Sequence, residues 1–189
     1  MTATLILEPK QKIYTVEEYF EFEKHSEIRY EYVDGKLIAM PGELLPNIEI
    51  SQNCFRTLAD LFEDKGCKTY IFNAKMAVNI NNRYRYPDVV VTCQKEPDVR
   101  MIQFPSLVVE VLSEGTKHVD KGDKLKEYRT LPTVQYYILV DSEKLEVTVY
   151  SRKDKHWVHK KYTALEDLIP LPFFDIQLPL KKLYKGLDF

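Results

Sequence analysis

A single acid interrupts the aliphatic run Leu107-Val108-Val109-Glu110-Val111-Leu112. The length and composition of this run predict a strand that is buried on both faces of a sheet. Burying a carboxylate costs several kcal/mol unless a cation or hydrogen bonds compensate it. The same cost of burial applies to Asp88, which follows Tyr86-Pro87 and lies 22 residues before Glu110. This acid is the first residue of the strand-like run Asp88–Thr92. The sequence therefore predicts two carboxylates held at chosen points in the core.

These two acids predict a metal site. Pro87 lacks an N–H and suits the first position of a strand, directly before Asp88. If the two strands are neighbours, Asp88 and Glu110 converge, and hard divalent cations prefer such oxygen ligands. The backbone carbonyl of Val111 would supply a third oxygen. Each acid taken alone could instead have a purely structural role. Asp88 could accept hydrogen bonds from turn amides, and Glu110 could form an ion pair with a nearby lysine.

Further candidates for the site lie on either side of these strands. Asp120 is expected to cap a helix that places Lys121, Lys124 and Tyr128 on one face, from which a lysine would face the carboxylates. Lys121 is interpreted as solvated helix surface, and Tyr128 as core packing. Upstream, Glu31 lies between two tyrosines in a strand-like segment, as a second unusual acid.

The periodicity along the chain predicts a mixed β-sheet flanked by helices, an α/β (α+β) fold. The 189 residues are expected to form one domain, with residues 1–12 as an extended N-terminal arm. Helices are predicted at Val16–His25, Asn47–Glu63 and Asp120–Arg129 and near Leu183. Strands are predicted at Ile28–Val33, Lys36–Met40, Lys68–Phe72, Met76–Ile80, Asp88–Thr92, Leu107–Leu112, Tyr136–Val140, Leu145–Tyr150 and His156–Tyr162, with the proline-rich tail as a loop.

Composition narrows the class of protein. Three widely spaced cysteines predict reduced thiols and a cytoplasmic location. No segment resembles a signal peptide, and no apolar run approaches the ~20 residues of a membrane span. The absence of a phosphate-binding loop or dinucleotide fingerprint predicts no organic cofactor.

Charge bears on nucleic-acid binding. The net charge of −2 argues mildly against tight, sequence-independent DNA binding, although a local basic rim would be averaged away in this number. A basic run near the C-terminus is interpreted as the solvated face of a hairpin, with contact to a DNA backbone as the less favoured alternative. It consists of Arg152, Lys153, Lys155, Lys160 and Lys161.

The order and spacing of these motifs resemble the Uma-type family of "putative restriction endonucleases", within the PD-(D/E)XK nuclease superfamily. The resemblance runs from about Tyr14 to Leu187. It rests on Glu31-Tyr32-Val33-Asp34-Gly35-Lys36-Leu37, Tyr86-Pro87-Asp88-Val89-Val90-Val91, Val108-Val109-Glu110-Val111-Leu112-Ser113, Asp120 through Lys124 to Tyr128, and Gln135-Tyr136-Tyr137 to Asp141.

The resemblance implies a restriction-endonuclease-like core with Asp88 and Glu110 as metal-binding acids. The superfamily lysine usually lies two residues after the second acid, where this chain has Leu112, and the family moves it to the position of Lys124. Glu31 would lie at the edge of the site. Two positions depart from the pattern, because members often carry His in place of Asn47 and an acid in place of Lys75.

The leading hypothesis is a Mg²⁺-dependent endonuclease, with Mn²⁺ as a substitute, that hydrolyses DNA phosphodiester bonds. A homodimer is expected, since cleavage of a duplex often needs one site for each strand. The alternative is a catalytically inactive nuclease-fold module that binds nucleic acid or a protein partner, with Asn47 and Lys75 as signs of decay. A purely structural dimerisation protein would leave the paired buried acids unexplained.

Overall fold

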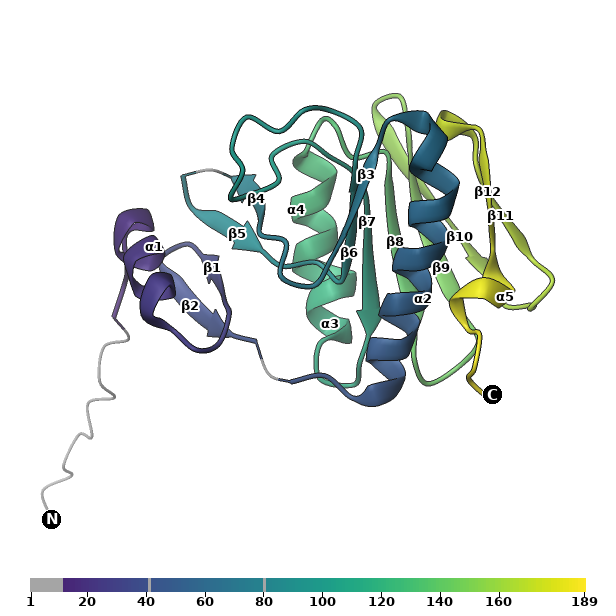
Figure 1. Cartoon of the computed structure of the whole chain (residues 1–189), viewed down its shortest axis with the longest axis horizontal. Coiled ribbons are helices and arrows are strands. Elements are labelled where there is room, and N and C mark those ends of the chain that lie inside the picture. The colour runs from purple at the N-terminus through teal and green to yellow at the C-terminus, as the bar shows by residue number, and fades with distance from the viewer. Residues whose placement is uncertain (1–11, 41, 80) are drawn as a thin grey trace, which may run out of the picture.

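The computed structural model of the chain describes residues 12–40, 42–79 and 81–189. The predicted arm, apart from its last residue, lies outside these ranges. A six-stranded sheet in the order β10-β9-β8-β7-β6-β3 forms the centre (Figure 1). Only the β7–β8 pair is parallel among the described strand pairs of this sheet, so the predicted mixed sheet is confirmed. The strands are β3 (Lys68–Ile71), β6 (Val89–Thr92), β7 (Pro105–Leu112), β8 (Tyr136–Asp141), β9 (Val147–Lys153) and β10 (His156–Tyr162).

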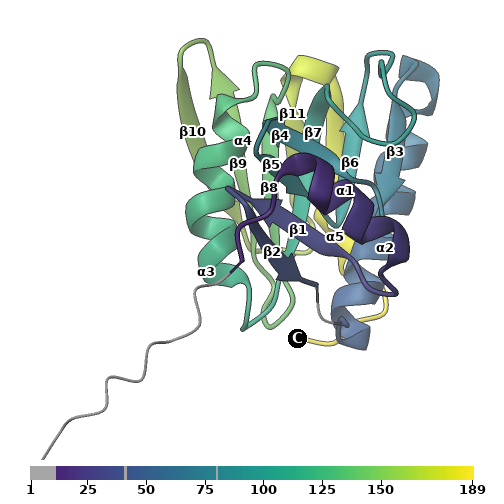
Figure 2. The same cartoon turned by 90° about the vertical axis from the view of Figure 1, so that its left-hand side faces the viewer.

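Helices cover both faces of this sheet (Figure 2). On one face, α2 (Leu45–Phe62) buries Ile50, Leu58 and Phe62 completely against the strands. On the other face lies a continuous helical segment made of α3 (Lys117–Val119), the π-helical turn Asp120–Lys124 and α4 (Leu125–Thr130). The parallel β7–β8 connection requires such a crossover. The site described below forms where this crossover meets the end of β7.

A smaller sheet packs beside the crossover and faces the viewer in Figure 2. It has the order β2-β1-β5-β4, with β1 (Tyr30–Val33), β2 (Lys36–Ala39), β4 (Met76–Asn79) and β5 (Arg83–Arg85). Asp34 and Gly35 join the two predicted strands as a tight two-residue hairpin turn, with positive φ angles of 50° and 87°. A capping box of Thr15 and Glu18 starts α1 (Val16–His25), which is the helix predicted there and buries Tyr19 against this sheet.

Three parts of the backbone differ from the prediction. The strand β5 lies between two predicted strands, in a segment for which no element was predicted. The proline-rich tail forms a hairpin of β11 (Leu168–Leu171) and β12 (Ile176–Pro179), because its prolines lie on a short two-stranded sheet where few N–H donors are needed. The crossover helix begins before Asp120, which is therefore no cap. Short helical segments complete the fold at Glu63–Lys65, Pro172–Phe174 and α5 (Leu180–Leu183).

The cysteines also differ from the prediction. Cys67 and Cys93 form a disulfide, and Cys54 is buried and free. The separation of 26 positions between the two bonded cysteines gives no sign of the bond in the sequence. However, Lys68 of β3 pairs with Thr92 of β6. The next residues outward, Cys67 and Cys93, therefore also lie opposite one another. The prediction of reduced thiols was wrong because spacing along a chain does not reveal cross-strand register.

We expect the double variant Cys67→Ser, Cys93→Ser to lose about 3 kcal/mol of unfolding free energy. The crosslink closes a loop of this length and so restricts the unfolded chain. Urea denaturation without reductant measures the difference, and reductant should bring the wild type to the level of the variant. A wild-type curve that reductant leaves unchanged would contradict the expectation.

Candidate active site

The register of β6 and β7 brings the two predicted acids together. Val89 pairs with Val109, so the next positions outward place Asp88 opposite Glu110. The carboxylate of Asp88 accepts a hydrogen bond from the N–H of Val111 through Oδ2, at 2.7 Å. The convergence expected from the two strands is thus present in the structure.

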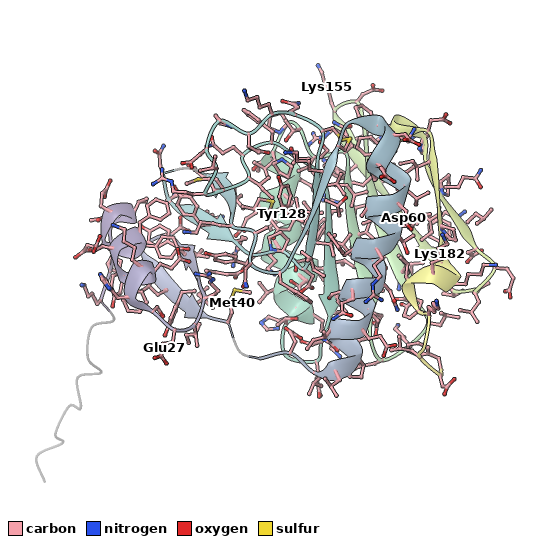
Figure 3. The ribbon with its side chains drawn as sticks, in the orientation of Figure 1. Glu27, Met40, Asp60, Tyr128, Lys155 and Lys182 are labelled. Carbon is pink, nitrogen blue, oxygen red and sulfur yellow. A yellow bond between two sulfur atoms is a disulfide. The ribbon has the colours of Figure 1, made fainter. Side chains whose placement is uncertain are left out.

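Both acids line a cavity of about 250 Å³ between the central sheet, the smaller sheet and the crossover helix. Met40, which leads from the smaller sheet toward α2, also lines this cavity (Figure 3). The charged groups around it are Glu31, Glu43, Arg85, Asp88, Glu110, Asp120 and Lys124. Acids outnumber bases in this set, so the cavity carries negative charge.

Glu110 is 3% exposed and is held by two donors. Lys124 Nζ lies 3.0 Å and the Tyr128 hydroxyl 2.9 Å from its Oε1 atom. Burial raises the pKa of Glu110 well above its usual value, although the positive charge of Lys124 opposes this shift. Tyr128 lies deep inside the molecule (Figure 3) and its ring is core packing as predicted, but its hydroxyl also fixes the acid.

Each of the two acids keeps one oxygen unused. No donor among the described residues reaches Oδ1 of Asp88 or Oε2 of Glu110, while the other oxygen of each acid is hydrogen-bonded. No group of three or more His, Cys, Asp or Glu in the described ranges is arranged to hold a metal. Mg²⁺ does not need such a group, because it usually takes one or two carboxylates and keeps several waters. The two unused oxygens therefore fit a small divalent cation.

Lys124 is buried among three carboxylates. Its Nζ lies 2.9 Å from Asp120, 3.0 Å from Glu110 and 3.8 Å from Glu31. Burial disfavours the charged ammonium, but Glu110, Glu31 and Asp120 together hold the pKa of Lys124 well above its usual value. The lysine predicted on the following helix is therefore brought into the site as a cation.

A π-helical turn positions this lysine. Such turns insert one residue into an α-helix and often occur at functional sites. Here the turn runs from Asp120 to Lys124 and points both side chains inward, while Lys121 is exposed as predicted. Asp120 was interpreted from sequence as a helix cap, so its place in the site was missed. The signal that could have revealed it is the acid–lysine spacing of i, i+4.

Arg85 holds the fourth predicted residue, Glu31. The guanidinium Nη1 lies 2.7 Å from Glu31, and the other two nitrogens bond Glu127 of α4 at 2.7 and 2.9 Å. All three side chains are at least nine-tenths buried. The structure therefore brings Asp88, Glu110, Lys124 and Glu31 together, and adds Arg85 and Glu127, which sequence analysis did not single out.

The two positions that depart from the family pattern take other partners. Lys75 forms a buried ion pair with Glu23 and lies over the ring of Phe20, 4.4 Å from its centroid. It therefore does not bring a second cation to the carboxylates. The Asn47 side chain donates to Glu43, which lines the cavity, at 3.2 Å.

We expect the stability of the metal-free protein to depend on the ionisation of Asp88. Burial raises the pKa of its carboxyl to about 7, while the Val111 N–H and Lys124 oppose the shift. The folded state therefore holds this proton more tightly than the unfolded state, and the resulting stability is lost as pH rises from about 4 through about 7.

The variant Asp88→Asn cannot ionise. It should become more stable relative to the wild type as pH rises, by on the order of 1–3 kcal/mol above pH 8. Urea unfolding in EDTA between pH 4.5 and 8.5 measures this difference. A difference that stays constant across this range would refute the assigned pKa.

The chain is similar to a known protein family and to two proteins of Synechocystis. A family model described as "Putative restriction endonuclease" (Uma2) matches residues 16–181. An uncharacterized protein of Synechocystis, slr1290, is 32% identical over 178 residues, which cover 92% of each chain. A second uncharacterized Synechocystis protein, sll1609, is 28% identical over 78% of this chain and 86% of its own.

A solved structure shares the fold. It is the crystal structure of "a putative nuclease belonging to DUF820" from Anabaena variabilis, with a TM-score of 0.72. The match covers 89% of this chain and 96% of that chain, at 19% sequence identity. No helix in the described part of this chain is long and apolar enough to cross a membrane.

Proposed function

Because the chain belongs to the family described as "Putative restriction endonuclease", we propose that it is a metal-dependent endonuclease that hydrolyses phosphodiester bonds in DNA. One observation carries the proposal: two carboxylates on neighbouring strands line one cavity beside a buried lysine, and each has an oxygen to which no described residue donates. A purely structural ion pair would need neither the second acid nor the cavity.

Asp88, Glu110 and the backbone carbonyl of Val111 would hold Mg²⁺, with Mn²⁺ as a substitute. When bound, the cation would polarise the scissile phosphate and lower the pKa of a coordinated water. Glu110 is held in place for this task by Lys124 and Tyr128, and Asp88 by the Val111 N–H. Side chains fixed in this way keep their geometry without reorganising during the reaction.

Lys124 would orient the attacking water and offset the negative charge that develops on the phosphate. Its raised pKa favours these roles over that of a base, because a charged ammonium cannot accept a proton. Asp120 shares the lysine with Glu110 and so holds its Nζ at the cavity wall. Glu31, anchored by Arg85, would hold a further water or a second cation.

We further propose that the chain acts as a single-domain homodimer on DNA, without an organic cofactor, in the cytoplasm. Reductants of the cytosol keep most thiols reduced, so the Cys67–Cys93 disulfide makes the location testable. Alkylation of thiols in intact cells, followed by a count on the isolated chain, measures how much of the bond forms there.

Incubation with supercoiled plasmid DNA tests the function. With Mg²⁺ or Mn²⁺ the wild type should convert the plasmid to nicked and linear forms, and EDTA should prevent both. DNA binding with no metal-dependent turnover would reject the proposal in favour of a module that binds without cutting.

A further inference from the structure

Two arginines and three aromatic rings form a surface cluster where β9 and β10 pass the end of α4. This hairpin patch consists of Arg129, Tyr150, Arg152, Trp157 and His159. The guanidinium of Arg129 lies 5.5 Å from the ring centre of Tyr150 and 5.8 Å from that of Trp157. The guanidinium of Arg152 lies 4.7 Å from the ring centre of Trp157, and the ring centres of Tyr150 and His159 are 5.5 Å apart.

The two arginines differ in how their donors are used. Arg152 donates to the backbone carbonyls of Arg129, Leu131 and Val134, which fixes it and the indole that it contacts. Arg129 makes no hydrogen bond or ion pair through its side chain with any described residue, and its Nε is buried without a partner. A half-buried guanidinium that lies within 6 Å of two ring centres and has no acidic partner among the described residues keeps donors for an anion.

The charge around the patch has the sign that an anion requires. Residues 151–161 contain five Lys or Arg and one Asp, whereas the whole chain carries a net charge of −2. Lys155 extends from the tip of the hairpin in Figure 3, whereas Lys153 and Lys160 alternate onto the sheet face opposite to Arg152 and Trp157. Proteins that bind nucleic acids concentrate positive charge on one face, and in the patch Arg129 and Arg152 supply this charge, with Lys155 at the tip of the same hairpin.

The patch shares a sheet face with the candidate active site. A chain of ring contacts runs from the site to the patch. The ring centres of Tyr128 and Tyr137 are 5.0 Å apart and those of Tyr137 and Tyr150 are 6.1 Å apart, and Tyr150 contacts His159. In the strand register Trp157 lies three strands and about four residues from Glu110. At ~4.8 Å per strand and ~3.3 Å per residue, their Cα atoms are about 20 Å apart.

We infer that the hairpin patch binds the phosphate backbone of the DNA duplex whose cleavage is proposed above. The separation of about 20 Å corresponds to roughly half a turn of B-DNA, so one duplex can contact both places. Arg129 binds a phosphate, Lys155 adds electrostatic attraction, and the rings hold the guanidinium in place. The inference rests on the proposed function, because it identifies where that substrate is held.

Trp157 is the only tryptophan of the chain, so its fluorescence reports on this patch directly. Titrating the wild type in EDTA with a 30-base-pair duplex should quench or shift the emission, and rising salt should reverse the change. EDTA withholds the metal, so binding is measured without cleavage.

Arg129→Gln should weaken binding about 5- to 10-fold and lower the salt slope by about 1, as expected for one lost phosphate contact. Lys155→Gln, an exposed substitution that leaves the packing intact, should weaken binding in the same direction. Arg56→Gln is the matched control, since it removes one charge from α2 on the opposite sheet face and should leave the affinity unchanged.

The outcomes separate the inference from the proposed function. Cleavage of DNA without any response of Trp157, or equal losses in the Arg129 and Arg56 variants, would overturn the inference and leave the nuclease standing. A response that Arg129→Gln weakens, in a protein that never cleaves, would support the patch and reject the nuclease. Absence of DNA binding under all salt conditions would overturn the inference.

Discussion

Glu110→Gln should abolish metal-dependent DNA cleavage, with a loss on the order of 10³-fold or more. The substitution removes the negative charge that would hold the cation but keeps the shape of the side chain. The amide oxygen can still accept from Lys124 and Tyr128, which lie 3.0 and 2.9 Å from Oε1 in the wild type. The variant should therefore fold, and its thermal unfolding should confirm this before activity is compared.

Titration calorimetry with Mn²⁺ supplies a second readout that needs no choice of DNA. Heat of binding should be present in the wild type and lost in Glu110→Gln. Glu114→Gln is the matched control, since Glu114 is exposed four residues further on and should keep both binding and cleavage. Full cleavage by the Glu110 variant would reject the assigned site, even if the protein proves to be a nuclease.

Arg85→Met should cost about 3–5 kcal/mol of unfolding free energy. It removes the cation that lies 2.7 Å from both Glu31 and Glu127, and thus leaves two buried carboxylates without their main partner. The side chain is 2% exposed, so water cannot replace the lost contacts. Methionine fills much the same volume, which makes the unpaired charge the main cause of the loss.

Urea denaturation measures this cost, and two further variants identify its origin. Arg100→Met removes an exposed arginine paired with Asp98 and should cost no more than about 1 kcal/mol. Adding Glu127→Gln to Arg85→Met should recover part of the stability, because it removes one of the two buried carboxylates that Arg85→Met leaves unpaired. A cost below about 1 kcal/mol for Arg85→Met alone would show that the buried pairs contribute little.

The central strands and the pairing of Asp88 with Glu110 were predictable because local signals mark them. Aliphatic runs identify buried strands whatever lies around them, and an acid inside such a run stands out. The strand β5 gives no comparable signal, since it consists of Arg83, Tyr84 and Arg85, and the acids that its arginines bind lie about 40 to 55 residues away in sequence. The location of these partners depends on tertiary structure alone.

Asp120 and the cysteines show two other limits of the sequence. An aspartate before a helical pattern is most often a cap, and only the start of the helix at Lys117 shows that Asp120 lies inside it. The disulfide depends on strand register, which sequence patterns fix only weakly for a strand as short as β3. The extent of the chain as one domain and the roles of the site residues stay predictions.

The groups around the cavity come from distant parts of the chain, from Glu31 in β1 to Lys124 in the π-helical turn. Joining such distant segments requires loop closure, which costs entropy before any contact compensates it. During synthesis, a nascent chain that ends before Lys124 lacks the cation that neutralises Glu110. The ribosome must therefore release almost the whole crossover before these acids can be buried together, so this centre cannot form until about two thirds of the chain has been made.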